Sequence, residues 1–307
     1  MEFKHIPVLL NEVLEGLNIR KGGVYLDCTI GGGGHSYEIL SRGISHLYGF
    51  DRDENAIKAS SERLKKFDNK TIVKSNYKDA PAYIEEQGVK LDGILIDLGV
   101  SSPQIDEAER GFSILHDGRL DMRMDASQEL DAYKVVNEYP KEKLLKILYE
   151  YGEEKNARAI VDKIIARRRL SPIETTFQLK DTIESAFPKK VMYSRGNVSQ
   201  QTFQAIRIEV NDELCGLEEC LRKLVMLLKP QGRMAVISFH SLEDRIVKNV
   251  FKDLSTDCIC PPRTPVCICG HRAKVKLVTR KPITATREEL SYNSRSSSAK
   301  LRIVEKL

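Results

Sequence analysis

The chain has 307 residues, a formal net charge of +5, and 41% hydrophobic and 30% charged residues. This length can bury a sizeable core in one large domain or in two ordinary ones. It contains no apolar run of about 18 residues, and residues 1–17 lack the apolar stretch and cleavage site of a signal peptide. We therefore expect neither a membrane span nor a secretory leader. The seven cysteines, an odd number partly placed in apolar segments, indicate a reducing compartment, so we expect a cytoplasmic protein.

The positive charge is concentrated at the C-terminal end of the chain. Residues 255–307 carry 11 Lys and Arg against 4 Asp and Glu, a net charge of +7. A basic surface attracts the phosphate backbone of a nucleic acid, partly through release of counterions. The same pattern is also typical of a solvated surface, so charge alone leaves both interpretations open.

The first hundred residues alternate between helix and strand patterns. Residues 5–17 and 55–66 have apolar side chains at helical spacing, and the predicted strands are 24–28, 46–50, 71–73 and 91–98. Residues 91–98 are apolar nearly throughout, as a central parallel strand should be. This order predicts βαβ units and a doubly wound α/β sheet.

Between residues 106 and 205 the pattern changes, because several amphipathic helices occur and no convincing strand does. One of these helices should be capped by Thr175 or Thr176. Strand and helix patterns then resume, with a strand at 234–239, a helix capped by Ser241, and two final strands. We predict a helical domain, 106–205, inserted into a sheet domain formed by residues 1–105 and 206–307.

The stretch "DCTIGGGGHS", residues 27–36, joins the first predicted strand to a helix. Glycine-rich turns at this place bind nucleotides in doubly wound folds. A Walker loop is excluded because no Gly-Lys-Ser/Thr occurs, and a dinucleotide loop fails because Ser36 or Tyr37 stands where its last glycine should be. The remaining nucleotide class is the S-adenosylmethionine (SAM) loop, in which glycines alternate after an acidic residue. A flexible loop without a ligand is the alternative.

Two acidic residues end predicted strands near this loop. Asp51 ends the second strand, 20 residues after Gly31, where a carboxylate can accept both ribose hydroxyls of a nucleoside or cap the next helix. Asp97 ends the fourth strand in "DLGVSSPQ". Methyltransferases of exocyclic base amines carry an Asp/Asn-Pro-Pro-aromatic loop there. This chain has the acid and one proline but no adjacent aromatic residue, so the stacking partner is open among Phe112, Tyr193 and Phe239.

Six segments carry a closer resemblance: "HIPVLLNEVL", "DCTIGGGGHS", "DGILIDLGVSSPQIDEAERGFS", "DGRLDMRMD", "TFQAIRIEVN" and "ISFHSLEDRIVK". Together they resemble the bacterial ribosomal RNA small subunit methyltransferase H family, also called MraW. The resemblance implies a SAM-methyltransferase sheet with a helical insertion and SAM as the cofactor. It also implies methylation of the N4 amine of a cytosine in 16S rRNA at the decoding centre, with the rRNA or the small ribosomal subunit as partner.

The resemblance also implies site residues. Its expected cofactor contacts are Gly33, Gly34, His35, Asp51, Tyr77, Asp97 and Gln104. His35 should act through its backbone more than through its imidazole. For catalysis we single out Asp97, Ser102 and His240. Asp97 could accept a hydrogen bond from the target amine or hold the amino group of the cofactor. Ser101, Ser102 and the carbonyl region of Pro103 are alternatives for the first role, and His240 could instead make a hydrogen bond at a helix start.

Two further motifs have alternative interpretations. In "HDGRLDMRMD", residues 116–125, the candidate substrate-binding residues Arg119, Asp121 and Arg123 could meet RNA or form internal salt bridges. In "CICPPRTPVCICGH", Cys258, Cys260, Cys267 and Cys269 could bind zinc, form two disulfides or stay free thiols. No metal is needed for the expected reaction.

Two other functions compete with rRNA methylation. A DNA amino-methyltransferase should have an intact Asn/Asp-Pro-Pro-aromatic loop, which is absent here. A non-catalytic SAM- or RNA-binding assembly factor should lose the acids at the strand ends, yet Asp51 and Asp97 are present. The sequence leaves the oligomeric state open, a homodimer included, and does not distinguish naked rRNA from an assembled subunit as substrate.

Overall fold

The computed structural model describes residues 7–261, 266 and 268–307, without the side chains of Ser102, Pro103, Tyr193 and Arg195. The chain forms two compact units, which are described separately. One unit, the sheet unit, consists of Met1–Gly99 and Cys215–Leu307, and the other, the helical unit, is Val100–Leu214. The predicted boundaries lay after residues 105 and 205. The second differs because helix α11 (Gln200–Asn211) packs on helices α6 and α7 of the helical unit.

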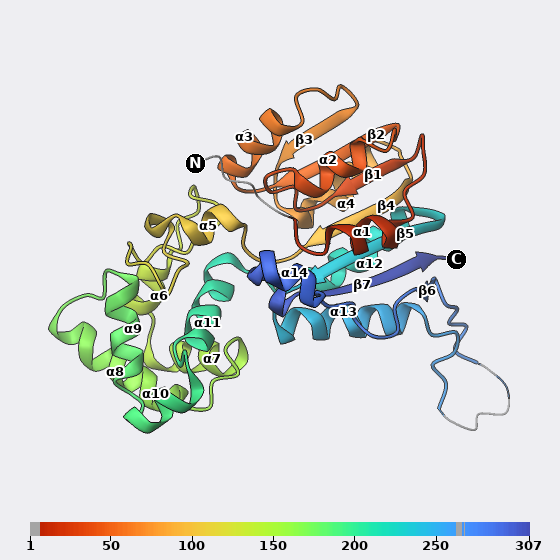
Figure 1. The fold of residues 1–307 in the computed structure, drawn as a ribbon. Coiled ribbons are helices and arrows are strands. Elements are labelled where there is room, and N and C mark those ends of the chain that lie inside the picture. Colours follow the sequence, from red (N-terminus) through yellow and green to blue (C-terminus); the bar gives the residue numbers. More distant parts are fainter. Residues whose placement is uncertain (1–6, 262–265, 267) are drawn as a thin grey trace. The chain divides into compact units, whose positions relative to one another are not determined.

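The sheet unit is built on seven strands in the order β3-β2-β1-β4-β5-β7-β6 (Figure 1). Their bounds are β1 Val24–Asp27, β2 His46–Asp51, β3 Lys70–Lys74, β4 Leu91–Asp97, β5 Leu228–Ser238, β6 Val275–Leu277 and β7 Lys300–Lys306. Strands β1 to β5 are parallel to one another, and β7 is antiparallel to both β5 and β6. The sheet confirms the predicted α/β fold class.

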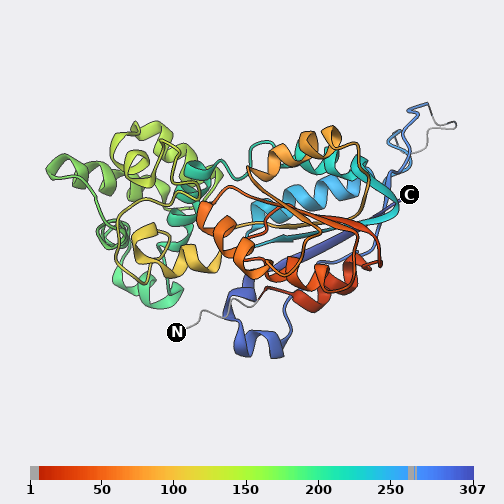
Figure 2. The ribbon, with the colours of Figure 1, turned by 90° about the horizontal axis from the view of Figure 1, so that it is seen from above.

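Helices cover both faces of this sheet (Figure 2). On one face lie α4 (Ala80–Glu86), α12 (Leu217–Leu227) and α13 (Ser241–Leu254). On the other lie α1 (Leu10–Leu17), α2 (Gly34–Leu40) and α3 (Glu54–Arg63). The β4 strand contributes alternate side chains to the two cores, since Ile94 and Ile96 face one core and Leu95 faces the other. Short helices η1 (Tyr77–Asp79), α14 (Arg287–Tyr292) and η3 (Ser294–Ser298) complete the unit.

The helical unit has its own hydrophobic core. Its elements are α5 (Ser102–Asp106), η2 (Ala108–Arg110), α6 (Ala132–Glu138), α7 (Lys141–Glu150), α8 (Ala157–Leu170), α9 (Thr176–Glu184), α10 (Lys189–Arg195) and α11. Buried aliphatic side chains of α6 to α9 and α11 form the core. The described part of this unit has no strand, only an isolated antiparallel bridge between Arg119 and Thr175.

Four local predictions can be compared with the structure. Thr175 caps α9 by accepting a hydrogen bond from the Gln178 amide, which confirms one of the two predicted caps. Ser241 does not cap α13, because His240 occupies the N-cap position. The first helix begins at Leu10, after residues 7–9, which were also predicted to be helical, because Leu9 has a left-handed φ of 52°. Residues 5 and 6 of the predicted helix lie outside the described residues. Strand β5 starts six residues before the predicted residue 234, because Leu228 already pairs with Leu91 of β4.

No described helix combines the length and the apolar character needed to span a membrane.

Candidate active site

Three aspartates end adjacent strands of the sheet, and we call them the aspartate site: Asp27 on β1, Asp51 on β2 and Asp97 on β4. Strand β1 lies between β2 and β4 and is parallel to both, so the carboxyl ends of all three strands lie at one edge. The chain order reverses at β1 and β4, which makes this edge the topological switch point of the sheet (Figure 1). Doubly wound folds bind their ligands at this point.

Asp27 is a buried anchor of the glycine loop, with only 1% of its surface exposed. The Ser36 hydroxyl donates to its Oδ2 at 2.6 Å, and the Thr29 amide donates to its Oδ1 at 3.2 Å. Burial raises the pKa of Asp27 to about 6, against the opposing effect of the two hydrogen bonds. The carboxyl group therefore holds both ends of the loop and has no free face for a ligand.

Asp51 is fixed by two backbone donors. The Gly31 amide donates to its Oδ2 and the Asp53 amide to its Oδ1, each at 2.9 Å. Burial raises the pKa of Asp51, whereas these two hydrogen bonds lower it. Each carboxylate oxygen has a second lone pair, so a fixed Asp51 can still accept hydrogen bonds from a ligand. The alternative role as a helix cap belongs to Asp53, whose side chain accepts from the Asn55 amide at the start of α3.

The glycines of the loop are required partly by the protein itself. Gly33 has a φ of +74°, and a Cβ there would lie 3.3 Å from Ser60 Cα. A Cβ on Gly34 would lie 2.5 Å from Cγ of Pro7. At these two positions an added side chain would therefore meet residues of the chain itself.

Asp97 is the aspartate whose side chain is least satisfied. Its amide donates to the Thr29 hydroxyl at 2.7 Å, which fixes the end of β4 on the glycine loop. The side chain is 24% exposed, yet its Oδ1 atom is buried and accepts no hydrogen bond from the described residues. Burial raises the pKa of Asp97 well above its ordinary value, and the negative charges of Asp27 and Glu243 raise it further. A buried acceptor without a donor is costly, so it marks a place where a ligand can donate.

His35 lies inside the protein, with 6% of its surface exposed. Its Nε2 atom is 3.0 Å from the Val8 carbonyl oxygen, and its Nδ1 is 4.0 Å from Oδ2 of Asp97. If Nε2 carries the proton and donates to Val8, Nδ1 faces the Asp97 carboxyl group. The imidazole is thus part of the frame around Asp97.

Tyr77 and Gln104, two other predicted cofactor contacts, each make contacts within the protein. Tyr77 begins the short helix η1 after β3, and its ring packs against the hydrophobic core beside α4 and α12. Gln104 is buried in the helical unit, where its side-chain oxygen accepts a hydrogen bond from the Ser101 amide at 2.9 Å. This contact closes the turn that precedes α5.

His240 holds the start of α13, which is the structural alternative given above for this residue. Its Nδ1 accepts from the Glu243 amide at 3.5 Å, and its Nε2 lies 3.2 Å from a carboxylate oxygen of Glu243. The second approach is close, but it is not aligned as a hydrogen bond. Of the other catalytic candidates, Asp97 belongs to the aspartate site, whereas the side chain of Ser102 lies outside the described part.

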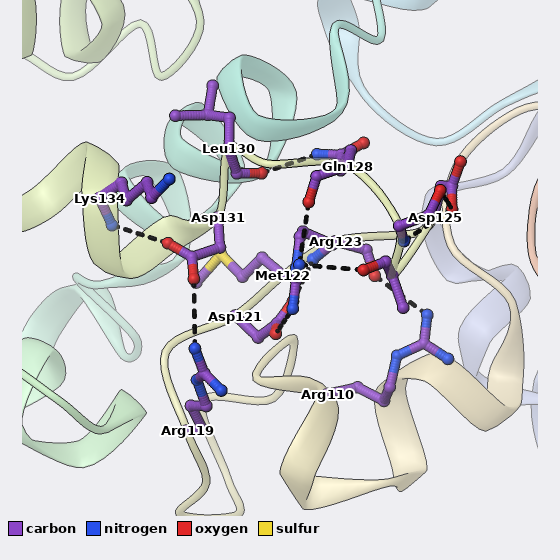
Figure 3. Close-up of polar contacts among 12 residues, drawn as sticks. Arg110, Arg119, Asp121, Met122, Arg123, Asp125, Gln128, Leu130, Asp131 and Lys134 are labelled. Atoms are coloured by element: carbon purple, nitrogen blue, oxygen red, sulfur yellow. Dashed lines mark hydrogen bonds and ion pairs between the residues drawn. The ribbon is translucent and has the colours of Figure 1, made fainter.

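Two arginines and two aspartates of the helical unit form a second charged group, which we call the Arg–Asp cluster. Its members are Arg119, Asp121, Arg123 and Asp131 (Figure 3). Arg123 forms a bidentate pair with Asp121 at 2.9 and 2.7 Å and also donates to the carbonyls of Ala126 and Gln128. Burial would raise the pKa of Asp121, but the hydrogen bonds and charge of Arg123 outweigh it and the pKa is lowered. The side chains of Arg123 and Asp121 are only 19% and 15% exposed, so this pair is an internal salt bridge.

Arg119 differs from Arg123. Its side chain is 67% exposed and touches the buried Asp131 at 3.5 Å. Asp131 is itself the N-cap of α6, accepting from the Lys134 amide (Figure 3). Among the three predicted substrate contacts, Arg119 is thus the one that presents its guanidinium to solvent.

Asn211, at the end of α11, was missed by the sequence analysis. This buried side chain accepts from the Met124 amide at 2.8 Å and donates to the carbonyls of Met122 and Arg207. Met122 has a left-handed φ of 59°, so Asn211 stabilises a strained backbone. The residue stands in "TFQAIRIEVN", which was noted only as part of the resemblance. A long-range contact of this kind has no local signal in the sequence.

Comparison with known proteins places these features in a family. The model of the MraW methylase family matches residues 2–307. Proteins named "Ribosomal RNA small subunit methyltransferase H" from Finegoldia magna and Clostridioides difficile are 51% and 49% identical to this chain, each with 100% of both chains covered. A solved structure of an rRNA methylase from Streptococcus thermophilus is 11% identical to this chain, with a TM-score of 0.43 and 98% of each chain covered.

A family model that spans nearly the whole chain, together with full-length relatives at about half identity, confirms the resemblance seen in the sequence. The chain belongs to the MraW methylase family, and its methyl donor is SAM, as the sequence predicted.

Proposed function

We propose that this protein transfers the methyl group of SAM to the N4 amine of a cytosine in 16S rRNA, at the decoding centre of the small ribosomal subunit. The coarser part of this proposal is supported by the relatives, which are about 50% identical over their full length and are named as small subunit rRNA methyltransferases. The cytosine and its position come from the family resemblance. A substrate of this kind would place the protein in the cytoplasm, as its cysteine content also suggests.

The aspartate site fits the chemical groups of SAM. The cofactor carries a cationic amino group and two ribose hydroxyls, all of them hydrogen-bond donors. The site offers acceptors, namely the second lone pairs of Asp51 and the unpartnered Oδ1 of Asp97. We propose that Asp51 holds the ribose and that the backbone at Gly33, Gly34 and His35, with Tyr77 and Gln104, supplies further contacts to the cofactor.

The single observation that carries the proposal is the buried Oδ1 of Asp97. A cytosine amine is a weak nucleophile, because its lone pair is delocalised into the ring. An acceptor that binds one N4 hydrogen favours the pyramidal nitrogen that can attack the methyl group. When bound, SAM supplies the electrophilic methyl group on its sulfonium.

The proton balance agrees with the electrostatics of Asp97. As the bond from N4 to the methyl carbon forms and the carbon–sulfur bond breaks, N4 becomes cationic and must lose one proton. Burial and two nearby negative charges raise the pKa of Asp97, so its carboxylate is a better base than an exposed one. The target base must leave its stack to reach this position, at a cost of about a few kcal/mol. Ser102 and His240 remain proposed helpers at the same step.

Asp97 could instead hold the amino group of SAM, and kinetics distinguish the two roles. Loss of a contact to the cofactor in Asp97→Asn would raise the KM for SAM, whereas loss of a base would lower kcat with little change in that KM. A carboxamide keeps the size of the side chain and one acceptor oxygen. The variant therefore tests the charge and basicity of Asp97 more than its volume.

Methyl transfer from tritiated SAM tests the whole proposal. Small ribosomal subunits, free rRNA and DNA should be offered in parallel, and the labelled nucleoside should be identified by mass spectrometry. We expect label as N4-methylcytidine in rRNA or in the subunit, and only background with Asp97→Asn. Label in DNA alone would indicate an amino-methyltransferase of DNA, and no label anywhere would indicate a non-catalytic factor; either result overturns the proposal.

A further inference from the structure

The segment between α13 and β6 contains a group of thiols that the proposed reaction does not use. It runs from Ser255 to Lys274 and includes Cys258, Cys260 and Cys269. Its apolar side chains do not form a core, since Ile259, Val266 and Ile268 are 58%, 72% and 84% exposed. These described apolar side chains therefore contribute little hydrophobic stabilisation to the segment.

The two ends of the segment are fastened to each other. The Lys274 amide donates to the Leu254 carbonyl at 2.8 Å, and the Ala273 amide donates to a carboxylate oxygen of Asp257 at 3.1 Å. These bonds hold the residues before Cys258 close to the residues after Cys269. The thiols thus lie on the two ends of one segment, and hydrogen bonds hold these ends together.

The sulfur atoms of the three cysteines form a compact triangle. All three lie within 4.8 Å of one another, and the sulfurs of Cys258 and Cys269 are 3.8 Å apart. The Ile268 amide donates to the sulfur of Cys260 at 3.4 Å. The thiolate is the form of cysteine that binds a metal.

The distance between the sulfurs of Cys258 and Cys269 is that of two ligands on one metal ion. With a zinc–sulfur bond of about 2.3 Å, two thiolates on a tetrahedral zinc lie about 3.8 Å apart. A disulfide would bring two sulfurs to about 2.05 Å. The separation of Cys258 and Cys269 therefore matches shared coordination and not a covalent bond between them.

We propose that Cys258, Cys260 and Cys269 bind a structural zinc ion. On binding, the three thiols release three protons and coordinate as thiolates. Soft thiolate ligands in a tetrahedral arrangement favour zinc over magnesium or calcium. The ion would supply the cross-link that the segment lacks, and it would order the basic residues that follow, Arg272, Lys274 and Lys276.

The three cysteines leave one position of a tetrahedral ion open. Cys267, the fourth cysteine of the motif, lies outside the described residues. His271 does not join the group of three sulfurs that lie within 4.8 Å of one another. A closed set of four protein ligands is typical of structural zinc sites, whereas catalytic sites keep one position for water.

Zinc content of the full-length protein tests the proposal directly. The protein should be purified under reducing conditions without chelator and analysed for metals by mass spectrometry. We expect about one zinc per chain. The variants Cys258→Ser and Cys269→Ser should lose it, whereas Cys215→Ser should keep it. Cys215 is the matched control because it is an exposed thiol of the same unit without a disulfide.

Three results would overturn the proposal. The first is less than about half a zinc per chain in wild-type protein that has also been supplied with zinc during expression. The second is equal zinc content in wild type and in a folded Cys258→Ser variant, as judged by circular dichroism. An iron–sulfur cluster in place of zinc, seen by its colour and iron content, would equally contradict it.

Cobalt substitution gives an independent readout. Co²⁺ in a tetrahedral thiolate site has intense visible bands that report the number of sulfur ligands. We expect a spectrum with at least three sulfur ligands. An octahedral cobalt spectrum would count against the site. Chelation of the metal should also increase proteolysis within residues 255–274 without affecting α13 or β7.

Discussion

The aspartate site and the Arg–Asp cluster both concentrate charge, but they differ in how that charge is satisfied. At the sheet edge, three carboxylates end neighbouring strands, and burial raises the pKa of each one. In the Arg–Asp cluster, each acid has an arginine partner, and the pKa of Asp121 is lowered. The first arrangement costs stability and the second contributes to it.

This difference indicates which group is available for chemistry. Perturbed carboxyl groups with unpartnered atoms concentrate at sites that receive a ligand. The bidentate pair of Arg123 and Asp121 has a structural role. Arg123 also donates to backbone carbonyls, so moving either partner would break several contacts. Four substitutions can break or sharpen the comparison.

The largest effect should come from Asp97→Asn. Loss of the base should lower kcat by about 10²–10⁴-fold, as is usual for general acid–base groups. In the wild type, kcat/KM should fall as the pH drops through the pKa of Asp97, which lies above the ordinary range of aspartate because of burial. Initial rates of methyl transfer between pH 5 and 9 would measure both effects.

The matched control for that variant is Asp68→Asn, at an exposed aspartate in the turn before β3. It should keep the wild-type rate and pH profile. If Asp97→Asn also keeps them, the unpartnered carboxylate has no role in catalysis and the comparison fails at its most important point.

Arg123→Ala should destabilise the helical unit. The change leaves the Asp121 carboxylate 15% exposed and without its bidentate partner, and frees two backbone carbonyls. We expect a loss of about 3 kcal/mol of unfolding free energy, comparable to breaking a partly buried ion pair. Urea unfolding followed by circular dichroism would measure it. If Arg123→Ala is as stable as the wild type, the Arg–Asp cluster does not stabilise the unit. Arg123 would then again be a candidate for RNA contact.

Asp27→Asn should change how stability depends on pH. The pKa of about 6 in the folded protein exceeds the ordinary value of about 3.9, so the folded state favours the protonated form. The stability linked to Asp27 is therefore fully present below about pH 4 and is lost as the pH rises through about 6. The effect should be on the order of 2 kcal/mol.

Asparagine stays neutral at every pH, so the variant should lose less stability than the wild type between pH 5 and pH 8. Unfolding free energies at the two pH values test this, with Asp68→Asn as the control. An identical pH dependence in Asp27→Asn and wild type would mean that the carboxyl group is not held in its neutral form.

Arg119→Ala should have the smallest effect. Because its guanidinium is 67% exposed, the change should cost less than about 0.5 kcal/mol of stability. If Arg119 contacts a phosphate, rRNA affinity should fall about two- to ten-fold, and the slope of log affinity against log salt should lose about one unit. Lys163→Ala, an exposed cation on α8, is the control. Equal salt slopes for Arg119→Ala and wild type would remove Arg119 from the substrate contacts.

Much of the fold follows from local patterns in the sequence. The buried run of β4 and the alternation of strands with helices predict a doubly wound sheet without any knowledge of distant contacts. The acids at the ends of β2 and β4 follow from the same patterns, because parallel strands place their carboxyl ends at one edge. The change to purely helical periodicity likewise predicts the insertion, although the boundaries depend on how α11 packs.

The roles of single side chains depended on contacts between residues far apart in the chain. Arg119 and Arg123 alternate in one motif and cannot be told apart by sequence, yet one is exposed and the other is held by Asp121. Asn211 lies 87 residues from the Met124 amide that it binds, so no local pattern predicts that contact.

The sequence by itself determined the fold class, the edge of the sheet that carries the site and the family of the protein. These depend on periodicity and on short motifs, both of which are properties of neighbouring residues. Tertiary structure alone decided that Asp97 keeps an unpartnered oxygen, that Pro7 and Ser60 occupy the space beside two loop glycines, and that three cysteine sulfurs meet. The physical reason is that hydrogen bonding, burial and coordination depend on distances in space, which separation along the chain does not specify.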